Sequence, residues 1–244
     1  MLSGPIWKPD AVLRLFLGVF VCLFVGALLA NLLRHFTDSF GTDSPWRAVV
    51  SALFFQGAAL LFIQRFLQDH DLRWSQAFGF LNDRKRALAL GVVVTFCFLP
   101  VGWALQFVIG GIFDRLEIDI PIQPAVQALE TSSGMLNRVA LGAIVILLAP
   151  MAEEILFRGV LYPFIKQFGF PRLALWGTSV LFAAIHVNAV AFVPLLILSL
   201  VLTTLYEHTG NLLAPVAAHA LFNAINFILL FFGDDFARLL PSQQ

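Results

Sequence analysis

Long apolar runs, separated by short polar segments, follow one another along most of this chain. The runs are continuous rather than alternating, which favours helices, and most approach the roughly 20 residues that a helix needs to cross a bilayer. Because lipid admits only helix bundles and closed barrels, the pattern predicts an all-α, polytopic transmembrane helix bundle. We expect about seven spans, within a range of six to eight, at residues 11–33, 48–66, 87–113, 139–164, 173–190, 192–206 and 212–232.

The composition supports the same class of protein. Of 244 residues, 59% are hydrophobic and only 12% are charged, whereas a soluble domain carries about 25% charged residues. The formal net charge is zero, so no positive field points to a nucleic-acid partner. The length suits a single membrane domain over residues 1–244 and leaves no room for a sizeable soluble domain.

Basic residues mark one side of the predicted bundle. They lie near the N-terminus, between the second and third spans and between the fourth and fifth: Lys8, Arg65, Arg73, Arg84, Lys85, Arg86, Lys166 and Arg172. Cytoplasmic loops carry an excess of Lys and Arg. We therefore predict a multi-pass protein of the bacterial plasma membrane with a cytoplasmic N-terminus, and an interfacial helix within residues 72–82.

Two adjacent carboxylates interrupt the fourth apolar run. Glu153 and Glu154 follow Pro150, which breaks the local backbone hydrogen bonding. A charge at membrane depth costs a few kcal/mol or more, so such residues are usually functional. Adjacent helix positions point about 100° apart, whereas Glu154 and Arg158 share a face and can form an ion pair. We expect Glu153 to perform chemistry, with Glu154 and Arg158 in support.

The fifth predicted span carries His186 at a matching depth. Glu153 lies sixteen positions before Gly169 and His186 lies fifteen after Pro171. At about 1.5 Å per residue, both stand roughly 22 to 24 Å from the turn between these helices. An antiparallel pair of helices therefore brings Glu153 and His186 to the same level.

The last span adds His219 and Asn223, four positions apart and hence on one face. His219 is only about 12 Å from the preceding turn near Asn211. It reaches the level of Glu153 only if the hairpin between the fourth and fifth spans projects into the cytoplasm.

These residue types permit hydrolysis by two routes. In one, Glu153 is the general base on a water positioned with His186, and His219 and Asn223 donate to the developing oxyanion. In the other, Glu153, His186 and His219 hold a divalent metal such as zinc. The spacing does not demand a metal, because the chain has no HExxH pair. A proton-coupled transporter with a Glu/His relay is an alternative from a different class.

Three motifs in order along the chain resemble those of a known family. The string EEILFRG at 153–159 resembles an EExxxR signature, Phe182 with His186 an FxxxH motif, and His219 with Asn223 an HxxxN motif. Together they resemble the CPBP family of intramembrane proteases, which includes CAAX proteases and bacteriocin-processing proteins. The similarity covers about residues 142–227, within a motif-bearing core at 139–232.

This resemblance implies hydrolysis of a peptide bond in a membrane-anchored substrate, prenylated or otherwise hydrophobic. It implies water activation by Glu153 with His186, and an oxyanion hole made by His219 and Asn223. The preferred scheme needs no cofactor, and zinc is the alternative. Some members of the family act as scaffolds, so a non-catalytic membrane scaffold is a further alternative. The motifs encode neither the substrate nor the oligomeric state.

Overall fold

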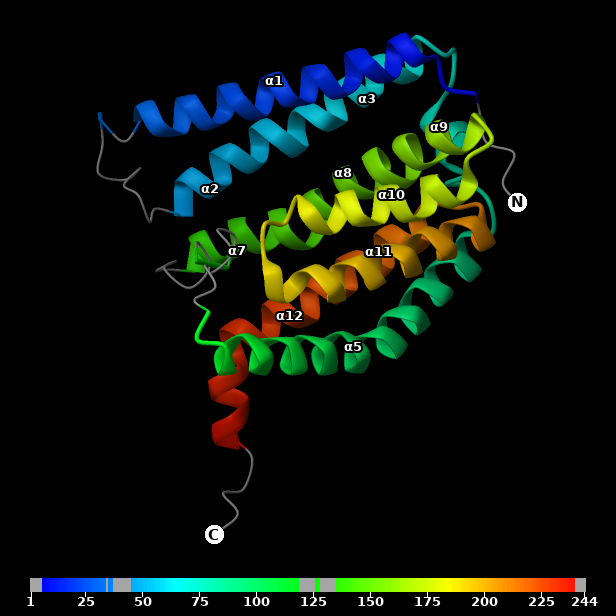
Figure 1. Cartoon of the computed structure of the whole chain (residues 1–244). Helices are drawn as coiled ribbons and strands as arrows, with labels where there is room; N and C mark the ends of the chain where they lie inside the picture. Colours follow the sequence, from blue (N-terminus) through cyan, green and yellow to red (C-terminus); the bar gives the residue numbers. More distant parts are fainter. Residues whose placement is uncertain (1–5, 34, 37–44, 119–125, 128–134, 240–244) are drawn as a thin grey trace.

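The computed structural model describes residues 6–33, 35–36, 45–118, 126–127 and 135–239, and every regular element in these ranges is a helix (Figure 1). The predicted all-α class is therefore confirmed. In chain order the elements are α1 (Pro9–Leu33), α2 (Pro45–Ala52), η2 (Leu53–Gly57), α3 (Ala58–Gln68), α4 (Trp74–Phe78), α5 (Arg84–Arg115), α7 (Met135–Ala143), η3 (Ile144–Leu148), α8 (Ala149–Glu154), η4 (Ile155–Leu161), α9 (Tyr162–Gln167), α10 (Pro171–Ala184), α11 (Ala189–Thr209) and α12 (Leu213–Leu239).

Three of these elements, η2, η3 and η4, are π-helical segments inside longer continuous helices. Within the described ranges, six helical stretches are long and apolar enough to cross a membrane, so the protein is an integral, multi-pass membrane protein. They are Pro9–Leu33, Trp46–Gln68, Arg84–Arg115, Met135–Gln167, Ala189–Thr209 and Leu213–Phe231.

The fifth predicted span, residues 173–190, is not one long helix. Helix α10 stops at Ala184 after 14 residues, too short for a full span. The chain then turns through Val187, whose φ of 49° is unusual for a β-branched residue. The side chain of Asn188 accepts a hydrogen bond from Ala191 N and so starts α11. The apolar run continues to residue 190, but α10 ends at Ala184 and a new helix begins after Asn188.

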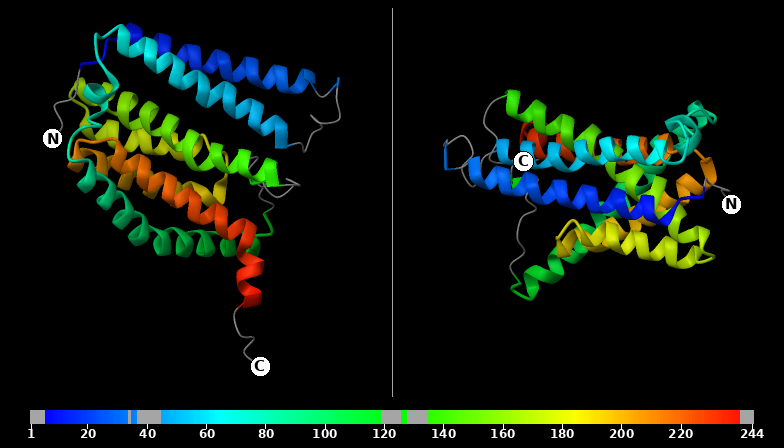
Figure 2. Two further views of the ribbon diagram at one scale, coloured as in Figure 1. Left: turned by 180° about the vertical axis from the view of Figure 1, so that it is seen from behind. Right: turned by 90° about the horizontal axis from the view of Figure 1, so that it is seen from above.

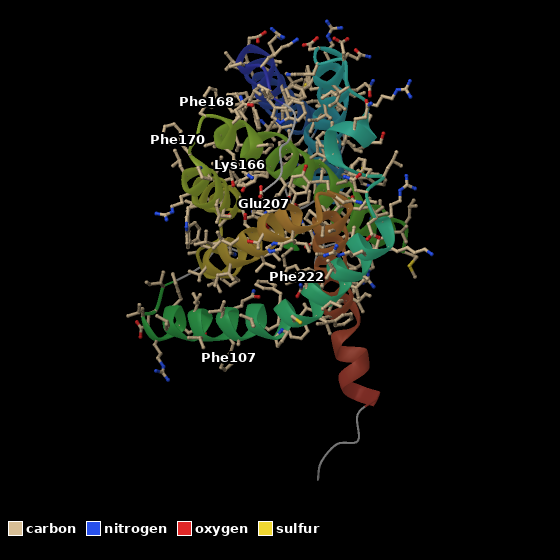
Figure 3. The ribbon with its side chains drawn as sticks, turned by 90° about the vertical axis from the view of Figure 1, so that its right-hand side faces the viewer. Phe107, Lys166, Phe168, Phe170, Glu207 and Phe222 are labelled. Atoms are coloured by element: carbon tan, nitrogen blue, oxygen red, sulfur yellow. The ribbon has the colours of Figure 1, made fainter. Side chains whose placement is uncertain are left out.

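The N-terminal segment and the turns that carry the basic residues lie together at one end of the bundle (Figure 1, right; Lys166 and Glu207 are labelled in Figure 3). The sequence had predicted that these segments share a side. The contacts that join them are Trp7 N to Gln167 Oε1 (2.8 Å), Lys8 Nζ to Asp69 O (2.7 Å), Asn82 Nδ2 to Gly210 O (3.2 Å) and the ion pair of Lys166 with Glu207. The expected interfacial helix is α4, but its Ala77 and Phe78 are buried in the bundle.

Gly159 sets the relative depth of the two motif-bearing helices. A Cβ at Gly159 would lie 2.7 Å from the Phe78 ring and 3.6 Å from Leu212, and Leu212 N donates to Phe78 O (3.0 Å). These three residues are therefore level. Glu153 lies six positions before Gly159 and His219 seven after Leu212, so both sit about 9 to 10 Å further in. The helix that carries Glu153 extends beyond the level of the α11–α12 turn. Glu153 and His219 therefore lie at one level.

The helices form layers. Helices α1 and α3 pair on one side, the long helix from α7 to α9 lies beside them, and α5 covers α11 and α12 on the far side (Figures 1 and 2). Thr95 of α5 donates to Ala218 O of α12 (3.0 Å), and a Cβ at Gly91 would lie 2.7 Å from Ala214 O, so the two helices nearly touch. Helix α5 contains Pro100 and curves.

Candidate active site

The site is built on a disturbed stretch of the fourth long helix. Helix α8 has Pro150 in its first turn and lies between the π-helical segments η3 and η4. Ala149 N donates to Ile144 O, five residues back, and Pro150 has no N–H. The carbonyl of Val145 therefore lacks a donor from its own helix. Asn223 Nδ2 of α12 supplies one at 2.9 Å.

Glu153 and Glu154 occupy different environments, as their angular separation predicts. The Glu154 side chain is fully buried, whereas the Glu153 side chain is 14% exposed. Only Glu153 thus retains contact with the outside of the bundle. Glu154 contributes its charge to a sealed network.

Arg158 is the hub of that network. The expected ion pair with Glu154 is present, with Arg158 Nη1 at 2.8 Å from Glu154 Oε1. Nη2 donates to Ser199 Oγ (2.7 Å) and Ser199 O (3.1 Å), and Nε donates to Thr203 Oγ1 (3.3 Å). The guanidinium also lies 4.6 Å from the centre of the Phe182 ring, a cation–π distance. One buried cation therefore joins η4, α10 and α11.

His219 lies between the two glutamates. Its Nδ1 is 2.9 Å from Glu154 Oε1, and its Nε2 is 3.9 Å from Glu153 Oε2. An ionised carboxylate only accepts hydrogen bonds, so Nδ1 carries the proton and donates to Glu154. Nε2 is then the ring atom that faces Glu153.

His186 stands just past the end of α10. Its Nδ1 is 2.7 Å from Phe182 O, and since a carbonyl only accepts, Nδ1 donates and the neutral ring keeps Nε2 as an acceptor. The Phe182 ring lies 4.9 Å from the His186 ring and 5.8 Å from the His219 ring. Among the described residues no hydrogen bond joins His186 to Glu153, so His186 reaches the cluster through Phe182.

The metal alternative finds a poor fit in this arrangement. Within the described residues no three His, Cys, Asp or Glu side chains are placed to hold a metal ion. Zinc needs ligand atoms at about 2.0 to 2.2 Å around one point. Here His219 Nδ1 donates to Glu154, and the Phe182 ring contacts both histidine rings in tilted or edge-on geometry. We therefore derive no step through a metal.

Sequence reasoning missed the residues that hold Arg158. Ser199 and Thr203 lie four positions apart in an apolar helix, which is the spacing of one helix face. That pattern was available as a signal. The acceptor role of the Val145 carbonyl had no signal, because it depends on the π-helical register around Pro150.

Comparison with known proteins agrees with this geometry. Residues 135–225 match the family model described as "Type II CAAX prenyl endopeptidase Rce1-like". This part of the chain is therefore similar to Rce1-like domains. All three motifs, from Glu153 to Asn223, fall inside the match, and the resemblance to the CPBP proteases is confirmed. The matched region is therefore similar to a family of CAAX-type proteases.

Two curated bacterial proteins are similar to the chain. The "Uncharacterized protein YpbD" of Bacillus subtilis (strain 168) is 39% identical over 83 residues, which is 32% of this chain and 40% of that protein. The "UPF0177 protein YxdF" of Lactococcus lactis subsp. lactis (strain IL1403) is 30% identical over 96 residues, 39% of this chain and 52% of that protein. The matches thus span about half the length of these relatives or less. No solved structure matches the chain.

Proposed function

We propose that this protein is an intramembrane endopeptidase that hydrolyses a peptide bond of a membrane-anchored, hydrophobic or lipidated protein or peptide. The observation that carries the proposal is the meeting of Glu153, Glu154 and His219, from two helices, at one depth inside the bundle. Of these, only Glu153 combines a carboxylate with partial exposure. The match to a CAAX prenyl endopeptidase family supports a protease and makes lipidated substrates the first class to test.

In the proposed reaction Glu153 takes a proton from a water while the water oxygen bonds to the scissile carbonyl carbon. His186 Nε2, which accepts hydrogen bonds in the neutral ring, holds this water from the other side. Collapse of the tetrahedral intermediate breaks the C–N bond, and the proton on Glu153 passes to the leaving nitrogen. The products are one new carboxyl group and one new amine.

Two further side chains are placed to steady the oxyanion. Asn223 donates one Nδ2 hydrogen to Val145 O and has a second N–H that can donate to the oxyanion. His219 donates through Nε2 when its ring carries both protons, because Nδ1 already donates to Glu154. Glu154 and Arg158 act as positioning residues that fix the His219 ring. Lys8 and the basic turns support our proposal that this end of the bundle lies in the cytoplasm.

The test is cleavage by purified protein in liposomes. The probes are a peptide ending in a prenylated cysteine and a plain transmembrane peptide, with the products identified by mass spectrometry. We expect Glu153→Gln to lower kcat at least 100-fold, because loss of a general base removes about 10² to 10⁴ of the rate. Glu207→Gln is the matched control, because Glu207 pairs with Lys166 at the end of the bundle.

Full activity of Glu153→Gln would contradict the assigned role. No cleavage of either probe by the wild-type protein, with the fold intact, would favour a scaffold. Proton-coupled solute uptake into the same liposomes, lost in Glu153→Gln, would instead favour a transporter.

A further inference from the structure

Gln56 is a buried polar residue that the proposed reaction does not use. It is 8% exposed, and its Oε1 has no hydrogen-bond partner in the part of the chain that the structure describes. Folded proteins leave few buried polar atoms unpaired, and membrane interiors offer no water to compensate for one. A retained orphan acceptor of this kind therefore points to a donor that arrives from outside the folded chain.

The packing of its helix shows where Gln56 faces. Val49, seven positions earlier, packs in one cluster with Ile144, and Ile63, seven positions later, packs in one cluster with Ile155. Gln56 lies in the π-helical segment between these two contacts. Phe54, two positions earlier, faces α1, where a Cβ at Gly26 would lie 2.4 Å from it. Because residues two positions apart point to nearly opposite sides of a helix, Gln56 faces away from α1 and toward the stretch midway between Ile144 and Ile155. That stretch is α8, against which η2 packs and which carries Glu153.

The backbone around Gln56 is also unusual. Gln56 lies in η2, and the other two π-helical segments, η3 and η4, flank α8. Single π-helical turns occur frequently at functional sites, where they reorient side chains. Three such segments therefore surround one short stretch of helix. One of the three, with Gln56, lies outside the Rce1-like match at 135–225.

We propose that Gln56 Oε1 accepts a hydrogen bond from a backbone N–H of the substrate close to the scissile bond, and that Gln56 is a substrate-binding residue. This inference rests on the proposed function. A peptide must be unwound from its helix before its carbonyl can be attacked, and unwinding leaves backbone N–H groups without acceptors in a medium that cannot supply them. Gln56 offers an acceptor beside α8, where the substrate chain must pass to reach Glu153.

Gln56→Met tests the proposal, because methionine keeps the length of the side chain but lacks the strong acceptor. Gln64→Met is the matched control: Gln64 lies on the same continuous helix, and its Oε1 already accepts from Trp74 Nε1 (2.6 Å). The substrate is the peptide that the wild-type protein cleaves in the assay above. A second series of this peptide carries an N-methyl group on one backbone nitrogen at a time.

We expect Gln56→Met to raise KM about 2- to 10-fold with little change in kcat, the effect of one lost hydrogen bond. One N-methylated peptide should show the same rise with the wild-type protein and no further rise with Gln56→Met. In the absence of substrate, Gln56→Met should melt at the same temperature as the wild type or higher, because an unpaired buried acceptor is removed.

A lower melting temperature for Gln56→Met would overturn the proposal, because it would show that Gln56 has a structural partner. An unchanged KM, or additive effects of the variant and every N-methyl group, would also overturn it while leaving the protease function intact. Absence of cleavage by the wild-type protein would overturn the proposed function, and the role of Gln56 would fall with it.

Discussion

The α1–α3 pair and the α8–α12 core handle charge in opposite ways. Between α1 and α3 the contacts inside the membrane are apolar, as where a Cβ at Gly18 would lie 2.8 Å from the Phe62 ring. The ion pairs of Arg14 lie at the exposed end of that pair, with the Arg14 side chain 60% exposed. In the core, Arg158 is 1% exposed and serves four acceptor atoms. Charge is kept at the water surface where a helix only packs, and is buried where the site needs fixed geometry.

Replacing one arginine in each region, Arg158 in the core and Arg14 in the outer pair, should give the largest difference in stability between the two regions. Arg158→Met leaves the buried Glu154 without its cationic partner, with only the hydrogen bond from His219, and leaves the Ser199 and Thr203 hydroxyls without their donor. Breaking a buried pair in this way costs about 3 to 5 kcal/mol. We expect a large fall in the thermal unfolding temperature of the protein in detergent.

Arg14→Met is the matched control for the outer region. Exposed ion pairs contribute little, because water and salt screen them. Its melting temperature should stay close to that of the wild type. Equal losses for the two variants would show that the contrast between the regions is wrong.

The joint between the regions should be the next most sensitive point. Gly79 has a φ of 68°, and a Cβ there would lie 1.9 Å from Gly210 O in the α11–α12 turn. Gly79→Ala combines a left-handed backbone penalty with overpacking, so we expect about 2 to 4 kcal/mol of destabilisation.

Gly57→Ala supplies the contrast at a helical glycine. A Cβ at Gly57 would meet nothing within 4 Å, so the same substitution should stabilise the protein by about 0.5 to 1 kcal/mol. Urea unfolding followed by circular dichroism would measure both variants. A harmless Gly79→Ala would mean that the turn can move away from α4 at little cost.

Of the three destabilising substitutions, the one at Asn223 should have the smallest effect. Asn223→Leu leaves Val145 O unpaired in the interior, which costs about 1 to 3 kcal/mol. Asn226→Leu, about one turn beyond, loses the bond from Trp103 Nε1 and the bond to Phe222 O. These bonds are partly exposed, so water can replace them and the loss should cost less. Thermal unfolding in detergent ranks the two. If Asn226→Leu were the more destabilising of the two, the Val145–Asn223 hydrogen bond would not be important in holding η3 against α12.

Much of the fold follows from the hydrophobic pattern, because a helix in lipid satisfies its own backbone and needs only length and apolarity. Residues 139–164 were expected to be helical, and the helix runs from Met135 to Gln167. The end of α10 was harder to predict. It depends on Asn188 capping the next helix, and an Asn within an apolar run is equally compatible with helix–helix contact.

The residues of the candidate site could be proposed from the sequence, but their arrangement in space could not. The spacing of Glu154 and Arg158 predicted their ion pair, which is present. The depth of His219 could not be obtained from helix lengths alone, because it depends on which residues of α4, η4 and α12 touch. The π-helical segments could not be predicted from the hydrophobic pattern. A helix with hydrogen bonds between residues five apart and one with bonds between residues four apart bury similar side chains. The roles of Glu153, His186, His219 and Asn223 stay predictions.

The shortness of α10 has a consequence for the surrounding lipid. Its 14 residues make a cylinder about 21 Å long, roughly 9 Å less than the hydrocarbon thickness of a typical bilayer. A bilayer meets such a mismatch by thinning locally. We therefore expect the headgroup layer to dip toward the end of α10, where His186 stands, and to carry its hydration with it. The deformed bilayer, rather than a channel through the protein, would then deliver water to the reaction.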